Sequence, residues 1–289
     1  METAQLTNGK MQLDYLVDAG PRLTHLSLVG GANIFADLGK TKATTSAGDF
    51  IFYGGHRLWH APEAKPRSYL PDNTPPEVQR GDLTVTITGQ LEEQTGLQKE
   101  MQLKLQADRA ELSINHVIYN RGLWPIECAP WGITQLKTGG VAILPQYNQP
   151  FDEHGLLPNR QLNFWPYSDY QDERLELHQN AILVHGKPIS QPFKIGYLSV
   201  LGWSAYLYEN TLLIKQFEVD SGMYPDFNSN SEVYSNDQYL ELETLGTLRQ
   251  IAPGQSHVQK EVWRLFKVDS DIQRTPDALL QLCVQQLNQ

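Results

Sequence analysis

Two short segments, far apart in the chain, hold the residues best suited to chemistry. The first, residues 53–63, reads Tyr-Gly-Gly-His-Arg-Leu-Trp-His-Ala-Pro-Glu. Paired glycines permit a sharp backbone turn, aromatic faces pack against C–H surfaces, and planar charged groups hydrogen-bond to hydroxyls. This segment predicts a loop that binds a polyhydroxylated ligand. The structural alternative is that Arg57 pairs with Glu63, Trp59 lies in the core, and the two histidines are merely exposed.

The second segment, residues 239–246, reads Tyr-Leu-Glu-Leu-Glu-Thr-Leu-Gly. In a β-strand, Glu241 and Glu243 point to the same face. Neighbouring carboxylates repel and raise each other's pKa, which is one way to prepare a general acid or base. The alternative is a solvated outer face. A glycosidase reading fits less well, because two neighbours on one strand do not flank a scissile bond.

Three further groups of residues are weaker candidates. Trp131, between Pro130 and Gly132, is either a stacking platform or a core residue. A looser set near a probable loop rim is either ligand-binding or ordinary surface: Lys215, Tyr224, Asp226, Asn228, Asn230 and Glu232. His116 and His257 lie within expected strands and are interpreted as structural.

Alternation of apolar and polar residues with a period of two dominates the chain and predicts an all-β fold. Strands are expected at 83–88, 96–105, 110–119, 238–244 and 256–266, with a hairpin formed by 203–208 and 211–217. One helix, about 275–288, begins with Thr275 as a cap and Pro276 in its first turn. Long loops at 53–76, 145–170 and 221–234, rich in aromatics and proline, are expected to carry function. No linker interrupts the pattern, so we expect one domain over 1–289.

Composition restricts the partners. The net charge of −10 gives no basic stripe for nucleic acid or an anionic membrane. The N-terminus lacks a secretory pattern and no apolar run reaches membrane-spanning length, so a cytoplasmic location is expected. Cys128 and Cys283 have no disulfide or zinc spacing, and the common phosphate-loop, dinucleotide and hydrolase motifs are missing. The oligomeric state stays open.

The C-terminal part of the sequence resembles the end of aldose 1-epimerases. The similar segments are Leu242-Glu-Thr244, Ile251-Ala-Pro-Gly-Gln-Ser256 and Val262-Trp-Arg-Leu-Phe266. Gly54–Trp59, Pro130–Thr134 and Ser231–Tyr234 also look like an uncharacterised branch of mutarotase-like domains. The resemblance implies a galactose-mutarotase-like β-supersandwich with one C-terminal helix.

The resemblance also implies roles for individual residues. Glu243 falls at the family's general base, which takes the proton from the anomeric hydroxyl, and Arg57 resembles its substrate-binding arginine. The family's mid-chain acid is a histidine, but the comparable segment 129–134 contains none, so His56 or His60 is the candidate acid. The other expected binding residues are Trp59, Trp131, Lys215, Glu232 and Glu241. No cofactor or metal is implied.

Three functions follow from these residues. The first is an isomerase that interconverts the anomers of a sugar or sugar derivative by acid–base ring opening. The second is a carbohydrate-binding protein that has kept the scaffold without the acid. The third is an oligosaccharide hydrolase or lyase. The sugar itself, and whether it carries a phosphate, are not specified by the sequence.

Overall fold

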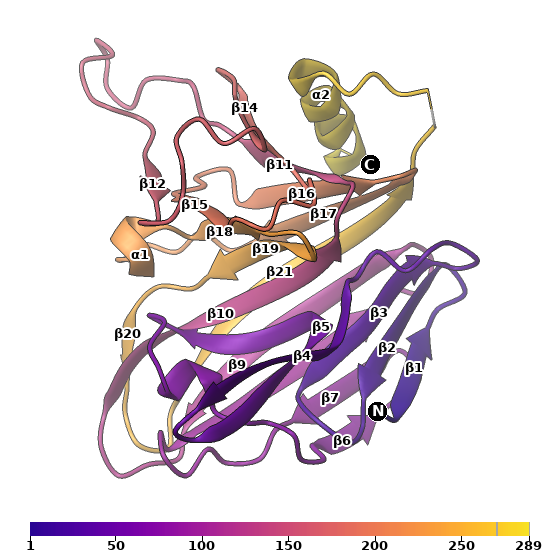
Figure 1. Ribbon diagram of the computed structural model, residues 1–289, viewed down its shortest axis with the longest axis vertical. Helices are drawn as coiled ribbons and strands as arrows, with labels where there is room; N and C mark the ends of the chain where they lie inside the picture. Colours follow the sequence, from indigo (N-terminus) through magenta and orange to yellow (C-terminus); the bar gives the residue numbers. More distant parts are fainter. Residues whose placement is uncertain (270, 289) are drawn as a thin grey trace.

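Two antiparallel β-sheets make up most of the computed structural model, which describes residues 1–269 and 271–288. Within these residues the first sheet has eleven strands and the second has ten (Figure 1). The path through the eleven-stranded sheet is β1 (Thr3–Thr7), β2 (Met11–Leu16), β3 (Arg22–Leu28), β5 (Gly48–Ala61), β10 (Ile126–Lys137), β19 (Tyr239–Leu245), β18 (Ser231–Ser235), β15 (Phe193–Tyr197) and β12 (Leu162–Phe164), with β4 (Asp37–Thr45) on β5 and β20 (Arg249–Ile251) on β10.

The ten-stranded sheet packs against one face of the eleven-stranded sheet. Its order is β13 (Leu175–Leu177), β14 (Ala181–His185), β11 (Val141–Pro145), β16 (Trp203–Tyr208), β17 (Thr211–Phe217), β21 (Ser256–Lys267), β9 (Glu111–Asn120), β8 (Leu97–Leu105), β7 (Thr84–Thr88) and β6 (Glu77–Arg80). Figure 1 shows the long strands β9, β10 and β21 running through the middle of the molecule, between the early strands and the C-terminal half. Both predicted features, the all-β class and the supersandwich, are confirmed.

The main core lies between the two sheets. Leu58 of β5 and Leu242 of β19 point into it from the eleven-stranded sheet, and Ile114 of β9 and Trp263 of β21 point into it from the other. Fully burying one such side chain contributes about 1.5–3 kcal/mol. Since side chains alternate along a strand, the neighbours of Leu58 and Leu242 lie on the opposite, outer face of the eleven-stranded sheet.

The predicted C-terminal helix is confirmed as α2 (Pro276–Leu287). The Thr275 hydroxyl accepts a hydrogen bond from the Ala278 backbone N–H at 3.4 Å. Leu279 and Cys283 are fully buried against the outer face of the ten-stranded sheet. The helix therefore covers one outer face. Among the described residues, loops, the short helix η1 (Arg67–Tyr69) and the hairpin of β4 with the start of β5 cover the outer face of the eleven-stranded sheet, on which Leu38, Phe50 and Phe52 pack.

The predicted loop at 53–76 is partly wrong, because β5 continues through Ala61. Gly54 and Gly55 have φ of +84° and +67°, so they do bend the backbone, but within the strand. A Cβ at Gly55 would lie 1.8 Å from the backbone oxygen of Leu23, and one at Gly54 would lie 2.0 Å from that of Ala36. Only glycine fits here, since the neighbouring strands approach too closely for a side chain. The predicted loop at 221–234 likewise ends at residue 230, where β18 follows.

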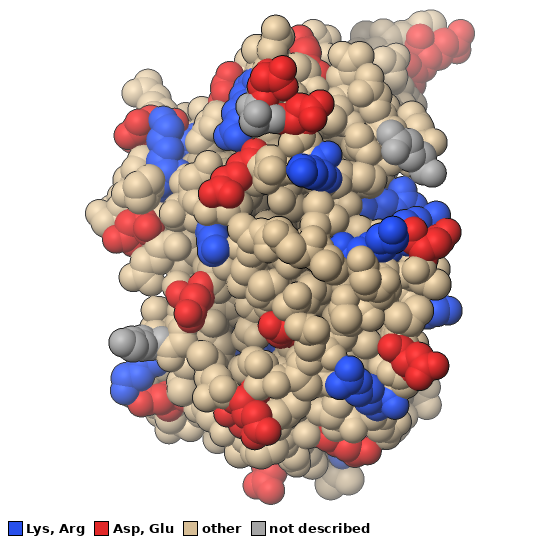
Figure 2. All heavy atoms as spheres, turned by 90° about the vertical axis from the view of Figure 1, so that its right-hand side faces the viewer, with Lys and Arg blue, Asp and Glu red and all other residues tan. Residues whose placement is uncertain are grey.

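Charged residues are interspersed on the surface. Figure 2 shows Lys and Arg next to Asp and Glu on one face, around a mostly uncharged centre. In the described part of the chain, no helix is long and apolar enough to cross a membrane. The single domain over 1–289 stays a prediction.

Candidate functional site

The strand register brings polar side chains from five strands to the outer face of the eleven-stranded sheet. Ile133 of β10 lies opposite both Arg57 of β5 and Glu243 of β19. Glu243 lies opposite Glu232 of β18. Side chains of directly opposed residues share a face, so strands distant in sequence build one surface. The prediction that Glu241 and Glu243 share a face is confirmed.

Arg57 and Glu241 join the early and late segments. The Arg57 Nη2 atom lies 3.1 Å from Glu241 Oε1, and Gln135 Nε2 donates to the same oxygen at 2.9 Å. Both bonds use Oε1, and among the described residues Oε2 of Glu241 has no hydrogen-bond partner. Burial, opposed by Arg57 and reinforced by Glu243, raises the pKa of Glu241 to about 7.

Lys194 of β15 occupies the centre of the carboxylate group. Its Nζ lies 2.7 Å from Glu232 Oε2 and 3.0 Å from Glu243 Oε2. Burial opposes the ammonium, but the two carboxylates outweigh it and raise the pKa of Lys194 well above its ordinary value. Burial is the chief cause that raises the pKa of Glu232 well above its usual range; the Lys194 charge opposes it, and the Glu243 and Asp226 carboxylates add to it.

Glu243 is held from a second side by Trp131, whose indole N–H donates to Glu243 Oε2 at 2.8 Å. Glu243 is fully buried, and within the described residues its Oε1 has no partner. Arg57 Nη1 and Trp59 Nε1 are likewise buried without a partner there. Buried polar groups usually find partners. Arg57 and Trp59 line the cleft, so their free N–H groups face the space for a ligand, whereas Glu243 lies beneath that lining.

Aromatic side chains form the walls of a cleft of about 580 Å³ above these groups. Trp59 and Trp131 pack edge to face with ring centroids 5.5 Å apart. The Lys194 ammonium lies 4.8 Å from the ring of Trp131 and 4.7 Å from that of Trp165, which places it between two indoles. The remaining aromatic walls are Phe52, Tyr69, Tyr167, Tyr234 and Tyr239.

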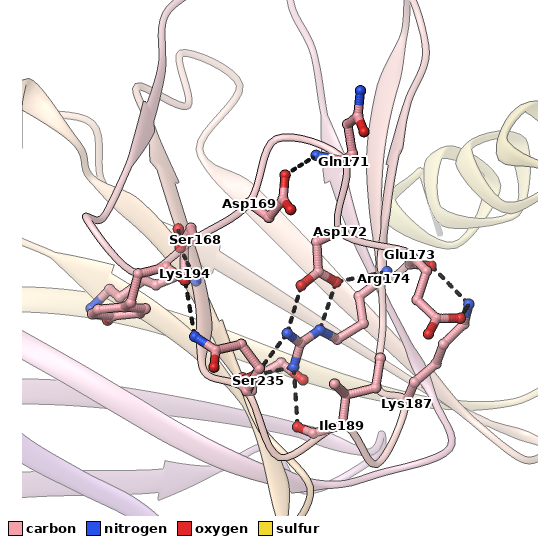
Figure 3. A network of polar contacts seen from close by, with 12 residues as sticks. Ser168, Asp169, Gln171, Asp172, Glu173, Arg174, Lys187, Ile189, Lys194 and Ser235 are labelled. Atoms are coloured by element: carbon pink, nitrogen blue, oxygen red, sulfur yellow. Dashed lines mark hydrogen bonds and ion pairs between the residues drawn. The ribbon is translucent and has the colours of Figure 1, made fainter.

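A buried arginine fixes the loop that carries Trp165 and Tyr167 (Figure 3). Arg174 binds both carboxylate oxygens of Asp172, at 2.7 and 2.8 Å, and donates to the backbone oxygen of Ser235 at 3.1 Å. Ser168 accepts from the Lys194 backbone N–H at 2.7 Å. These bonds fasten the loop to the ends of β15 and β18, so the cover of the cleft is positioned by strands of its floor.

A left-handed turn lies beside this cover. The segment α1 (Pro225–Asn228) contains three consecutive residues with positive φ: Asp226 at 50°, Phe227 at 55° and Asn228 at 68°. Each costs roughly 1–2 kcal/mol relative to the right-handed form. Asn163 of β12 compensates, since its side chain donates to the backbone oxygens of Asp226 and Phe227 at 3.1 and 3.2 Å.

Six of the nine predicted site residues meet here: Arg57, Trp59, Trp131, Glu232, Glu241 and Glu243. The other three do not, because they point to the opposite face of their sheet or belong to the other sheet. His56 contacts His116 at 2.7 Å in the core between the sheets, and His60 is buried on the same side of β5. Lys215 lies in that core too, 3.4 Å from Glu261. The sequence-based placement of the acid at His56 or His60, and of Lys215 in the binding site, is therefore corrected.

Several cleft residues escaped the sequence reasoning. Lys194 could have been recognised from the sequence, because it is the one cation within the apolar strand Phe193-Lys-Ile-Gly-Tyr197. Tyr239 stands at the start of the segment that carries Glu241. Trp165 and Tyr167 belong to the predicted functional loop at 145–170, but nothing in their spacing singles them out.

Comparison with solved structures identifies the fold. A galactose mutarotase-like protein from Lactobacillus casei aligns with a TM-score of 0.59 and 12% identity, covering 92% of this chain and all of that one. The GalM/aldose epimerase homologue from C. elegans aligns with a TM-score of 0.56 and 10% identity, over 93% and 99% of the chains. A TPR-domain containing protein from Parabacteroides distasonis gives 0.62 and 16%, over 95% of this chain and 49% of that one.

No family model and no curated protein matches the sequence. The solved structures show that the chain has the galactose-mutarotase-like fold. Because no sequence relative assigns a role to any residue, the site must be judged from the residues of this chain.

Proposed function

We propose that the cleft binds a neutral carbohydrate. The observation that supports this most is the combination of aromatic walls with the N–H groups of Arg57 and Trp59 and the Oε2 of Glu241, which are unpartnered among the described residues. Aromatic faces suit the C–H surfaces of a pyranose, and the free polar atoms suit its hydroxyls. The galactose mutarotase-like neighbours agree with a sugar ligand.

The charges favour a neutral sugar over a phosphorylated or acidic one. Two cations, Arg57 and Lys194, meet three carboxyl groups on the floor, and Glu63 adds another at the rim. Both cations are already paired with these carboxylates. An anionic group would therefore find no free cation among the described residues on the floor of the cleft and would be repelled by Glu63 at its rim.

Calorimetric titration of glucose, galactose, mannose and xylose, with glucuronate and glucose 6-phosphate alongside, tests this proposal. We expect at least one neutral sugar to bind and both anions to bind more weakly. Trp165→Ala removes one wall and is expected to weaken binding about tenfold, whereas the exposed Trp124→Ala leaves it unchanged. Failure of every neutral sugar to bind, or preference for the anions, contradicts the proposal.

A second candidate function is anomer interconversion with Glu241 as the acid–base group. Glu241 lines the cleft, has a free oxygen and has a pKa raised to about 7, which suits proton transfer near neutral pH. Its carboxylate takes the anomeric proton while a proton from solvent in the cleft reaches the ring oxygen, because burial raises the pKa of the Tyr239 phenol too far for it to act as the acid. Reversal after rotation returns both protons and gives the other anomer.

NMR exchange spectroscopy of freshly dissolved anomers measures this activity. If Glu241 is the acid–base group, Glu241→Gln lowers the rate about 10²–10⁴-fold, and Glu173→Gln, at an exposed carboxylate outside the cleft, serves as the control. Sugar binding without exchange above background selects the non-catalytic binding function instead.

A further inference from the structure

A second hollow, of about 210 Å³, adjoins the cleft, and Trp165 lines both. We propose that this outer hollow, formed by Asn163, Phe164, Trp165, Pro166, Asp226 and Phe227, binds a second sugar unit. The physiological ligand is then a disaccharide or longer glycan rather than a monosaccharide. The inference rests on the proposed carbohydrate binding in the cleft and specifies its substrate class.

The left-handed turn presents Phe227 to this hollow. The Phe227 side chain is 87% exposed, although a large apolar side chain is normally buried. Its backbone is nevertheless tightly held, because its oxygen accepts hydrogen bonds from the side chains of both Gln161 and Asn163. A strained backbone that is fixed by several bonds and exposes an aromatic ring is typical of a binding element.

Asp226 adds a carboxyl group to the lining of the outer hollow. It belongs to the left-handed turn, and burial is the chief cause that raises its pKa above the usual range. A glycan that extends past Trp165 would meet this hydrogen-bonding group beside two aromatic surfaces, Trp165 and Phe227.

The arrangement of the walls favours a sugar over a purely apolar group as the occupant. Phe164 packs edge to face against Tyr170, with ring centroids 4.6 Å apart, so two rings form the inner wall. Four of the six lining residues are apolar; the Asn163 amide is already bound within the turn, and the Asp226 carboxyl is the hydrogen-bonding group left for a ligand. Aromatic surfaces beside one carboxyl match a pyranose ring, which has C–H faces and a hydroxylated edge.

Calorimetry with matched ligands tests the inference. The probes are glucose, galactose and mannose, the disaccharides cellobiose, maltose, lactose and mannobiose, and 4-nitrophenyl glycosides of the same monosaccharides. We expect one disaccharide to bind about five- to tenfold more tightly than its non-reducing monosaccharide. Phe227→Ala should remove that gain and leave monosaccharide affinity unchanged, while Phe227→Tyr retains it.

Trp124→Ala, which removes an exposed aromatic ring outside both spaces, is the matched control and should change neither affinity. Thermal unfolding of each variant verifies that the fold is intact. If a monosaccharide binds but no disaccharide binds more tightly, or if Phe227→Ala lowers both affinities equally, the outer hollow is not a sugar subsite and the cleft proposal stands. A gain seen only with the 4-nitrophenyl glycosides assigns the hollow to an apolar group and overturns the inference. If no sugar of any length binds, the proposed function itself fails.

Discussion

Replacing Lys194 with methionine removes the cation that two buried carboxylates share. Lys194 is 4% exposed, and Glu232 and Glu243 are fully buried, so water cannot replace the lost charge. Methionine keeps an unbranched chain of similar length and fills the same space. Breaking a buried ion pair on one side costs about 3–5 kcal/mol. We therefore expect the free energy of unfolding at pH 7.5 to fall by about 4 kcal/mol.

The pH dependence of this loss has a defined sign. The ordinary pKa of Glu232 is 4.5, and in the folded protein it is raised well above that value, chiefly by burial. Above pH 4.5 the folded state then binds more protons than the unfolded state, so this group lowers stability as pH rises toward the folded pKa. Without Lys194 that pKa rises further. The penalty of Lys194→Met should therefore be smallest near pH 4.5 and grow toward neutral pH.

Urea unfolding at pH 4.5, 6.0 and 7.5 measures both the loss of unfolding free energy and its change with pH. The control is Lys187→Met, because Lys187 forms an exposed ion pair with Glu173 at 3.0 Å, and such pairs contribute at most about 1 kcal/mol. Adding Glu232→Gln to Lys194→Met should recover about 1–2 kcal/mol at pH 7.5, since one buried carboxylate is gone. A loss below about 1 kcal/mol, or one that does not change between pH 4.5 and 7.5, would refute the assigned charge cluster.

Three further predictions concern other parts of the molecule. Glu241→Gln should abolish any dependence of sugar affinity on a group that titrates near pH 7, as measured by calorimetry from pH 5.5 to 8.5. Gly55→Ala should cost more than about 4 kcal/mol in urea unfolding, because its Cβ would lie 1.8 Å from the Leu23 oxygen. Gly254→Ala, at φ +78° with nothing within 4 Å, should cost only about 1 kcal/mol. Burial lowers the pKa of His116 to about 4, so the unfolded state gains a proton first as pH falls below 6.5. At ~1.4 kcal/mol per pH unit, this one group should destabilise the protein by about 3 kcal/mol at pH 4, measured in urea unfolding as the part of the pH dependence that His116→Gln removes.

Alternation along the strands made much of the fold predictable. The hairpin of Trp203–Tyr208 and Thr211–Phe217 has the predicted bounds, because each strand ends at a polar turn. Thr275 and Pro276 identified α2 through local hydrogen bonding and backbone preference. These features depend on neighbours in sequence, so a single sequence contains the information.

The sequence-based prediction placed His56 and His60 in the site because a glycine pair can mark either a turn into a loop or a bend within a strand. Gly54 and Gly55 indicated a turn into a loop, whereas close approach of β3 and β4 makes them a bend inside β5. Once the segment is a strand, alternation puts Arg57 on one face and both His56 and His60 on the other. The close approach of Gly55 to the Leu23 backbone oxygen shows that the pair is a bend within a strand. This distance is set by tertiary packing, which local sequence patterns do not show.

Two requirements on a catalytic carboxylate separate Glu241 from Glu243. The group must be shielded enough for its pKa to shift, and it must also reach the substrate. Glu243 is fully buried beneath Lys194 and Trp131, both of which bond to its Oε2, so a substrate would have to displace a partner first. Glu241, two residues earlier on the same face of β19, lines the cleft with one oxygen free. Any anomeric chemistry in this protein should therefore be lost with Glu241→Gln at intact fold, whereas Glu243→Gln should act mainly by loosening Lys194 and lowering stability.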